Sequence, residues 1–189
     1  MVRRGDGAMR KLIWVGLAFC LVAMTSHAQD VPKADVALGY SYLHVNGQSG
    51  ASGYNNNGFS GSVAYNLTSA FGVVGDFGVY HGSVSGVGIT FESYTFGPRF
   101  SFRQNDKFVP FVQALFGGAH ENSITVGGVT VPSSNAFAFS FGGGTDIAIA
   151  KDGKIALRPQ FDYVGLRNNG ATTNTERVTV SIVFNLGQK

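Results

Sequence analysis

Apolar and polar residues alternate one by one along most of the chain after residue 34. This period of two puts successive side chains on opposite faces of an extended strand. Eight such segments follow one another: Asp35–His44, Phe59–Leu67, Phe71–Tyr80, Phe91–Phe102, Phe108–Ala119, Ala136–Ala148, Ile155–Val164 and Arg177–Leu186. The pattern predicts an all-β chain whose strands, at about ten residues each, are long enough to cross a membrane at a tilt.

The connections between these strands alternate in length. Three are tight, around Thr68–Ser69, Arg103–Asp106 and Lys151–Gly153. The other four are longer and rich in Gly, Asn and Ser: Val45–Gly58, His81–Gly88, Glu121–Asn135 and Gly165–Thr175. Short turns at one rim and long loops at the other are typical of an outer-membrane barrel. An even number of strands then places both termini at the short-turn rim.

The two faces of each strand differ in size. One face carries bulky apolar and aromatic residues, and the other carries Gly, Ala, Ser and Thr with an occasional charge. A soluble barrel would show many Lys and Glu on its solvent face, whereas small polar residues suit the crowded lumen of an eight-stranded barrel. We therefore predict an eight-stranded antiparallel up-and-down transmembrane β-barrel. The alternative, a secreted ligand-binding barrel, needs an apolar lumen, which the inward Asp and Arg residues oppose.

The composition agrees with this fold class. The 189 residues include 27 Gly, 16 Phe and one Cys, and charged residues make up 13%. That charge content is about half the usual ~25%. A disordered chain, a disulfide scaffold, a Cys-ligated metal domain and a coiled coil are all excluded by these numbers.

The first 28 residues have the features of a signal peptide. Arg10 and Lys11 precede the apolar run Leu12–Met24, and Ser26-His27-Ala28 matches a small-x-small cleavage signal. We predict removal of residues 1–28, a periplasmic segment at 29–34 and a barrel over 35–187, with translation starting at Met1 or Met9. The apolar run is shorter than the ~20 residues of a membrane anchor. Cys20 follows bulky Phe19, unlike the cysteine of a lipoprotein signal.

Loss of the signal peptide changes the charge of the protein. The segment holds four of the 14 basic residues and one of the 11 acidic residues, so the mature chain has 10 of each and no formal net charge. Nucleic-acid binding requires a clustered basic face. We therefore expect no nucleic-acid partner.

Charges on the small-residue face are the first candidate site. These are Asp76, Arg99, Asp146, Arg158 and Asp162. Because an unpaired charge in a filled lumen is strongly destabilising, we expect a structural salt-bridge network, with Asp146 facing Arg158 across a three-residue hairpin loop. A gated ion path is the alternative.

Two patterns at the long-loop rim resemble a metal site and an enzyme site. His44, His81 and His120 end the first, third and fifth strands, which are not neighbours, so we expect solvated histidines and no metal site. His81-Gly82-Ser83 with Glu92 is a weak match to the nucleophile, base and carboxylate of a lipid A deacylase. No catalytic residue, metal or other cofactor is assigned.

The long loops are the second candidate site. Asn46–Gly58 is polar and of low complexity, which indicates either a flexible surface loop or an adhesive contact anchored by Tyr54. Glu121–Asn135 has a Val-Gly-Gly-Val pattern that predicts a small hairpin above the membrane, with an edge strand open to a partner.

With its strands in this order, the chain resembles the outer-membrane β-barrel domain family, which includes OmpA-type and OmpX/Ail-type eight-stranded barrels. The resemblance covers about Asp35 to Gly187. It is carried by five segments, namely Phe71–Phe77, Phe96–Phe100, Val109–Gln113, Phe141–Asp146 and the closing strand to Phe184. No peptidoglycan-binding domain is expected.

The resemblance implies location in the outer membrane of a Gram-negative bacterium. It also implies insertion by the barrel-assembly machinery, which reads the last strand; five residues follow Phe184 here, so Phe184 or Leu186 is the expected signal. We expect a monomeric structural or surface-interaction protein of the cell envelope, adhesin-like, without an open pore and without enzymatic activity. Its expected partners are outer-membrane lipids, lipopolysaccharide and an extracellular ligand. The alternatives are a lipid-modifying barrel enzyme and a small ion pore.

Overall fold

The computed structural model describes residues 31–47, 53–84, 86–126, 129–168 and 170–188. The predicted signal peptide, the cleavage site after Ala28 and Cys20 lie outside these described residues. Within the described part of the chain, no helix is long and apolar enough to cross a membrane.

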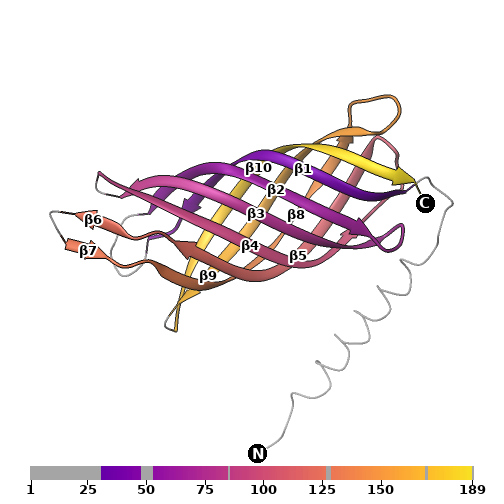
Figure 1. Ribbon diagram of the computed structural model, residues 1–189. Helices are drawn as coiled ribbons and strands as arrows, with labels where there is room; N and C mark the ends of the chain where they lie inside the picture. Colours follow the sequence, from indigo (N-terminus) through magenta and orange to yellow (C-terminus); the bar gives the residue numbers. More distant parts are fainter. Residues whose placement is uncertain (1–30, 48–52, 85, 127–128, 169, 189) are drawn as a thin grey trace, which may run out of the picture.

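The described residues form ten strands in two sheets (Figure 1). The strands are β1 Pro32–Val45, β2 Tyr54–Asn66, β3 Phe71–Val84, β4 Val87–Ser101, β5 Phe108–Glu121, β6 Ile124–Val126, β7 Val129–Val131, β8 Ser134–Ala148, β9 Ile155–Asn168 and β10 Ala171–Gln188. Eight of them close into a barrel in the order β1-β10-β9-β8-β5-β4-β3-β2, while β6 and β7 form a separate hairpin. All barrel neighbours are antiparallel, which confirms the predicted fold class.

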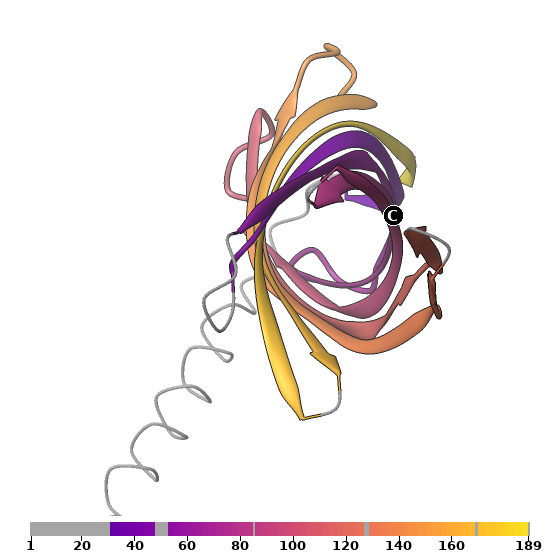
Figure 2. The ribbon, with the colours of Figure 1, turned by 90° about the vertical axis from the view of Figure 1, so that its left-hand side faces the viewer.

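The barrel closes between its first and last strands. β1 pairs with β10 from Pro32, opposite Gln188, to Val45, opposite Thr175. Figure 2 shows the strands joined into a ring. Closure gives every barrel strand a neighbour on both sides, so the backbone hydrogen bonds are made within the sheet, as a membrane interior demands.

The outer surface of the barrel is apolar. Phe59 is 74% exposed and Leu38 is 62% exposed, and similar side chains cover the outside of all eight barrel strands. The inward face carries the buried small and polar residues, such as Ser41, Ser62 and Thr179. Exposed apolar surface on this scale is explained by contact with lipid. The inside-out assignment of the two faces is therefore correct.

The apolar band ends at a row of polar residues on the outer face. His44, His81, Glu92, His120 and Glu176 are the first such residues above the aromatic and aliphatic ones on their strands. In the register, His44 lies opposite Glu176 and Glu92 lies opposite His120. The strands continue beyond this row toward the longer connections.

Several connections differ from the prediction because the strands are longer. β3 and β4 continue to Val84 and Val87, and β9 and β10 continue to Asn168 and Ala171, so two predicted loops are mostly paired strand. The positive φ of Gly86 and Gly170 allows the sharp turns that remain. Strand pairing rests on backbone groups, so Gly-, Thr- and Asn-rich segments still extend the sheet past the membrane.

Other boundaries also moved. β1 begins at Pro32, within the predicted periplasmic segment, and the connection after β8 spans residues 149–154, twice the predicted three residues. Tyr54 lies in β2 and not in a loop, while residues 48–52 of that predicted loop are outside the described part of the chain. The predicted hairpin in Glu121–Asn135 is confirmed by the pairing of β6 with β7.

Candidate functional site

The half of the lumen toward the short turns is built around Asp35 on β1. Its Oδ1 accepts hydrogen bonds from Nη2 of Arg158 at 2.9 Å and from Nη1 of Arg99 at 3.4 Å. Arg158 also donates to both carboxylate oxygens of Asp146. Asp35, Arg99 and Arg158 are buried. Two carboxylates and two guanidinium groups therefore neutralise one another in this layer.

An aromatic ring supports both arginines of this layer. The guanidinium carbons of Arg99 and Arg158 lie 4.3 Å and 5.0 Å from the ring centroid of Phe111 on β5. Such distances permit attraction between a cation and the face of the ring. Phe111 is one of several bulky residues on the inward face, as are Leu43 and Tyr80.

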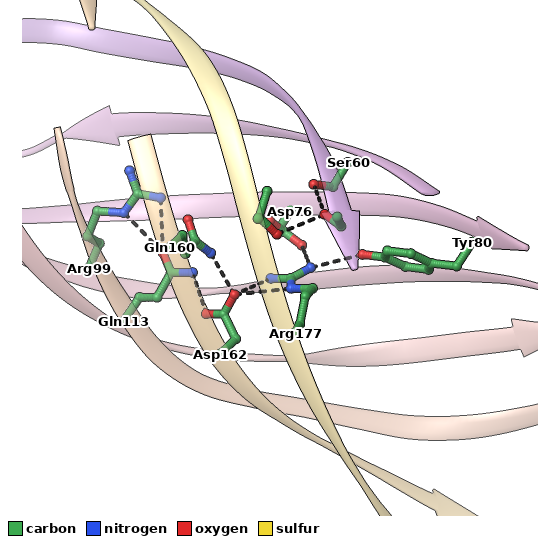
Figure 3. A network of polar contacts seen from close by, with 10 residues as sticks. Ser60, Asp76, Tyr80, Arg99, Gln113, Gln160, Asp162 and Arg177 are labelled. Carbon is green, nitrogen blue, oxygen red and sulfur yellow. Dashed lines mark hydrogen bonds and ion pairs between the residues drawn. The ribbon is translucent and has the colours of Figure 1, made fainter. Parts of the chain in front are cut away.

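A second layer, nearer the extracellular end, surrounds Arg177 on β10 (Figure 3). Its Nη1 donates to Asp76 at 2.7 Å and to the Tyr80 hydroxyl at 3.0 Å, and its Nη2 donates to Asp162 at 2.9 Å. Asp162 also accepts a bond from Gln160. One guanidinium thus joins side chains from β3, β9 and β10.

Gln113 connects the two layers. Its Oε1 accepts bonds from Nε and Nη2 of Arg99, and its Nε2 donates to Asp162 at 3.3 Å (Figure 3). The resulting network is continuous from Asp146 to Tyr80 and fills the middle of the barrel with hydrogen-bonded groups.

Of the five charges selected from the sequence, all lie in this network. Asp146 contacts Arg158, and Arg99 is linked to Asp162 through Gln113, whereas Asp76 is paired with a residue that was not selected. Asp35 and Arg177 were missed because they stand at the ends of predicted strands. Their place in the period-two alternation was the available signal, because Asp35 lies on the same inward face as Ala37 and Arg177 lies on the same inward face as Thr179.

The rim histidines contact polar neighbours on adjacent strands. The Nδ1 atoms of His44, His81 and His120 lie 2.7–2.9 Å from Asn55, Thr90 and Asn135 respectively. No group of three or more potential metal ligands occurs among the described residues. His81 and Ser83 both follow the outward parity of β3, and no hydrogen bond joins them in the described part of the chain.

The lumen opens into a cavity at each end. At the short-turn end, a cavity of about 1250 Å³ reaches from the turns to Asp146. Burial lowers the pKa of Arg103 at this entrance, against the opposing effect of Asp35 and Asp146. At the extracellular end, a cavity of about 320 Å³ lies among the upper ends of the strands.

The fold compares closely with known small membrane barrels. Neisserial surface protein A superimposes with a TM-score of 0.68 at 11% identity, over 82% of this chain and 97% of that chain. The attachment invasion locus protein Ail of Yersinia pestis gives 0.59 at 17% identity, over 82% and 99%. The chain has the fold of the small outer-membrane β-barrels. Together with the apolar outer surface, this fold places the protein in a bacterial outer membrane.

A third structure extends the comparison. The N-terminal β-barrel domain of Pseudomonas aeruginosa OprF gives a TM-score of 0.52 at 16% identity, over 82% of this chain and all of that chain. No family model and no curated protein matches the sequence. At these identities the likeness concerns the fold alone.

The two rims of this outer-membrane barrel differ in charge. The extracellular ends of the strands carry Glu92, Glu121 and Glu176 against Arg167. The periplasmic turns and strand ends carry Lys33, Arg103, Lys107, Lys151 and Lys154 against Asp106 and Asp152. The extracellular rim is therefore acidic and the periplasmic rim is basic.

Proposed function

We propose that the protein is a surface-interaction protein of the outer membrane, adhesin-like, which presents its extracellular hairpins to a partner. The observation that carries this proposal is the extension of the strands beyond the polar row formed by His44, His81, Glu92, His120 and Glu176. The β6–β7 hairpin lies beyond that row and, in the described part of the chain, forms a two-stranded sheet separate from the barrel. A two-stranded hairpin offers unpaired backbone edges to which another chain can add.

The proposal includes the absence of an enzymatic role and of an open pore. The buried network of Asp35, Arg99, Arg158, Asp162 and Arg177 supports a closed lumen, since its side chains occupy the middle of the barrel. His81 and Ser83 lack the mutual hydrogen bond that a base and a nucleophile share, as far as the described residues go.

The acidic extracellular rim bears on the kind of partner. A structure of Ail was determined in complex with the heparin analogue sucrose octasulfate, a polyanion. In the present chain three glutamates oppose a single arginine at that rim, so repulsion disfavours a polyanion. The partner that fits is a neutral or cationic surface.

Lipids and the assembly machinery complete the proposed partners. The outer face of the barrel would contact outer-membrane lipid and lipopolysaccharide, and Phe184 and Leu186 on β10 would be read during insertion. The protein would act as a monomer after removal of residues 1–28. Heat-dependent mobility in detergent gels, after envelope fractionation, tests the folded barrel.

Replacement of the β6–β7 hairpin tests the proposed surface interaction. Cells that display the protein should bind to host cells or to other bacteria more strongly than cells without it do. Replacement of residues 123–132 by a Gly-Ser segment should remove this additional binding. A matched Gly-Ser replacement in the periplasmic turn 103–106 serves as the control. Unchanged binding by the hairpin variant, with normal surface display, would refute the role of this hairpin. Planar-bilayer recordings that show steady conductance would refute the closed lumen.

A further inference from the structure

The extracellular cavity of about 320 Å³ lies inside the barrel and not between its loops. Most of its lining residues share the inward parity of their strands, and they come from β1, β2, β4, β5, β8, β9 and β10. Its volume is at the small end of the range for ligand pockets. A pocket lined by seven strands and open to the outside can admit a small molecule.

Slightly more than half of the wall is apolar or aromatic, and His120, Ser134, Asn168 and Thr173 belong to its polar part. Val45, Ile89, Phe91, Ala136 and Leu166 line the cavity together with Tyr54. The floor is closed by a stacked pair, because the rings of Phe91 and Tyr80 lie 4.7 Å apart with an interplanar angle of 29°. The hydroxyl of Tyr80 points into the polar network beneath, where it accepts a bond from Arg177. The stack thus separates the cavity from the charged layers.

One carboxylate lies in the wall of the cavity. Glu121 lines the cavity, and it lies near enough to Tyr54 to act with burial in raising the pKa of the Tyr54 hydroxyl. Arg167, the basic residue of the extracellular rim, follows the outward parity of β9 and does not line the cavity. The cavity therefore combines negative charge with the faces or edges of two aromatic side chains.

Polar atoms just below the cavity lack partners among the described residues. Both side-chain atoms of Asn56 are buried without a hydrogen bond, and so is the hydroxyl of Thr175. Asn56 is the next inward residue below Tyr54 on β2, and Thr175 is the next below Thr173 on β10. Unsatisfied buried polar groups are costly, and a bound molecule or water would relieve that cost.

We propose that this cavity binds a small organic cation with an apolar body, such as a quaternary ammonium compound. The apolar part would lie against Ile89, Phe91 and Leu166, and the cationic head would lie between Glu121 and the ring of Tyr54. Aromatic rings with a nearby carboxylate attract such cations because their positive charge is spread over apolar groups. This site is separate from the β6–β7 hairpin that carries the proposed surface interaction.

A pair of isosteric probes tests the charge requirement. Phenyltrimethylammonium and tert-butylbenzene have nearly the same shape but differ in charge. Each is titrated into the folded, isotope-labelled full barrel in maltoside micelles at pH 8. Backbone amide shifts of residues 119, 121, 136 and 166 report binding. We expect the cation to bind at least about tenfold more tightly than the neutral probe, a difference of about 1.4 kcal/mol.

Three variants locate the site. Glu121→Gln should weaken binding of the cation about tenfold and leave the neutral probe unchanged. Ala136→Trp, which fills the cavity, should abolish the amide shifts for both probes. Glu176→Gln removes a carboxylate from the outer face of the same rim and should change neither. A heat-dependent gel shift confirms that each variant is folded.

Two results would overturn the proposal. Equal binding of the two probes would show that the cavity selects apolar bodies without regard to charge. Shifts from the cation that persist in Ala136→Trp, or that disappear equally in Glu176→Gln, would show that the cation binds elsewhere on the acidic rim. Both outcomes are independent of the hairpin replacement that tests the surface interaction.

Discussion

Asp35 at the start of β1 accepts a 2.9 Å hydrogen bond from Arg158 on β9, although 123 residues separate them in the chain. The same oxygen also accepts a bond from Arg99 on β4. Three strands that are not neighbours in the barrel are therefore tied together across the lumen by one carboxylate. Such a cross-link forms only when the barrel has closed, so it couples closure to the pairing of charges.

Loss of Arg158 should destabilise the barrel. Arg158→Ala leaves Asp35 and Asp146 buried or half-buried without their shared cation, and breaking a buried ion pair costs about 3–5 kcal/mol. Urea-induced unfolding in detergent, followed by far-ultraviolet circular dichroism and by gel mobility, measures the change in the free energy of unfolding. Lys154→Ala is the control, because Lys154 pairs with Asp152 at the exposed periplasmic turn. An unchanged unfolding midpoint for Arg158→Ala would contradict a stabilising role of the network.

The hydroxyl of Tyr80 should contribute less, but measurably. Tyr80→Phe removes the acceptor of a 3.0 Å bond from Arg177 while keeping the ring that stacks on Phe91. Hydrogen bonds to charged groups contribute about 1.5–3 kcal/mol, so we expect a loss in the free energy of unfolding within that range. Tyr163→Phe removes a comparable hydroxyl that donates to Asn174 on the exposed outer side, and it should have a smaller effect. Equal losses in the two variants would mean that burial of the bond is irrelevant.

The sequence predicted the barrel well because lipid and lumen impose opposite demands on alternate residues. Phe59 and Ser60 illustrate this, since the first is largely exposed to lipid and the second is buried in the lumen. Parity therefore identified eight strands and their faces without knowledge of which strands pair. The charges nearest the strand centres followed from the same parity.

The alternation of residues did not predict which groups each charge pairs with, or how far each strand extends. Asp35 and Arg177 are the first residues of their predicted strands, and their partners Arg158 and Asp76 come from strands far away in the sequence. Pairing at that distance depends on barrel stagger, which alternation does not encode. The aromatic floor formed by Tyr80 and Phe91 was missed for another reason, because these two residues lie opposite each other at the ends of two predicted strands, beside a segment that was predicted to be a loop.

Backbone proximity at Gly97 should make that position intolerant of a side chain. A Cβ at Gly97 would collide with the backbone carbonyl oxygen of Ala114 on β5. Gly97→Ala should therefore lower the free energy of unfolding by about 1–3 kcal/mol, as overpacking does. Gly88→Ala is the matched control, since the nearest atom there is Cε1 of His81 at 3.5 Å. A neutral effect at Gly97 would show that β4 and β5 can separate locally.

Titration of Tyr54 offers a pH-dependent test at the extracellular mouth. Burial, with a smaller effect of Glu121, raises its pKa above the ordinary value near 10. The folded state then holds its proton more tightly than the unfolded state, so this contribution is complete below about pH 10 and is lost as the pH rises through the raised value. Ultraviolet difference titration of the wild type against Tyr54→Phe isolates this tyrosine. Glu121→Gln should lower the pKa of Tyr54. An unchanged pKa of Tyr54 in this variant would show that the Glu121 carboxylate does not act on the Tyr54 hydroxyl.

The closing strand provides the last prediction. Phe184 and Leu186 both face outward on β10, and either is a candidate for the signal that the assembly machinery reads. Phe184 lies opposite Val36 on β1 and Ile155 on β9, so its ring sits where the closing strand meets both neighbours. We expect Phe184→Ala to reduce the heat-modifiable, outer-membrane form in cells severalfold more than Leu186→Ala does. Refolding of both variants into detergent in vitro is the control, since a recognition defect spares it whereas a defect in barrel stability does not. The reverse order of the two variants in cells, with equal refolding, would assign the signal to Leu186.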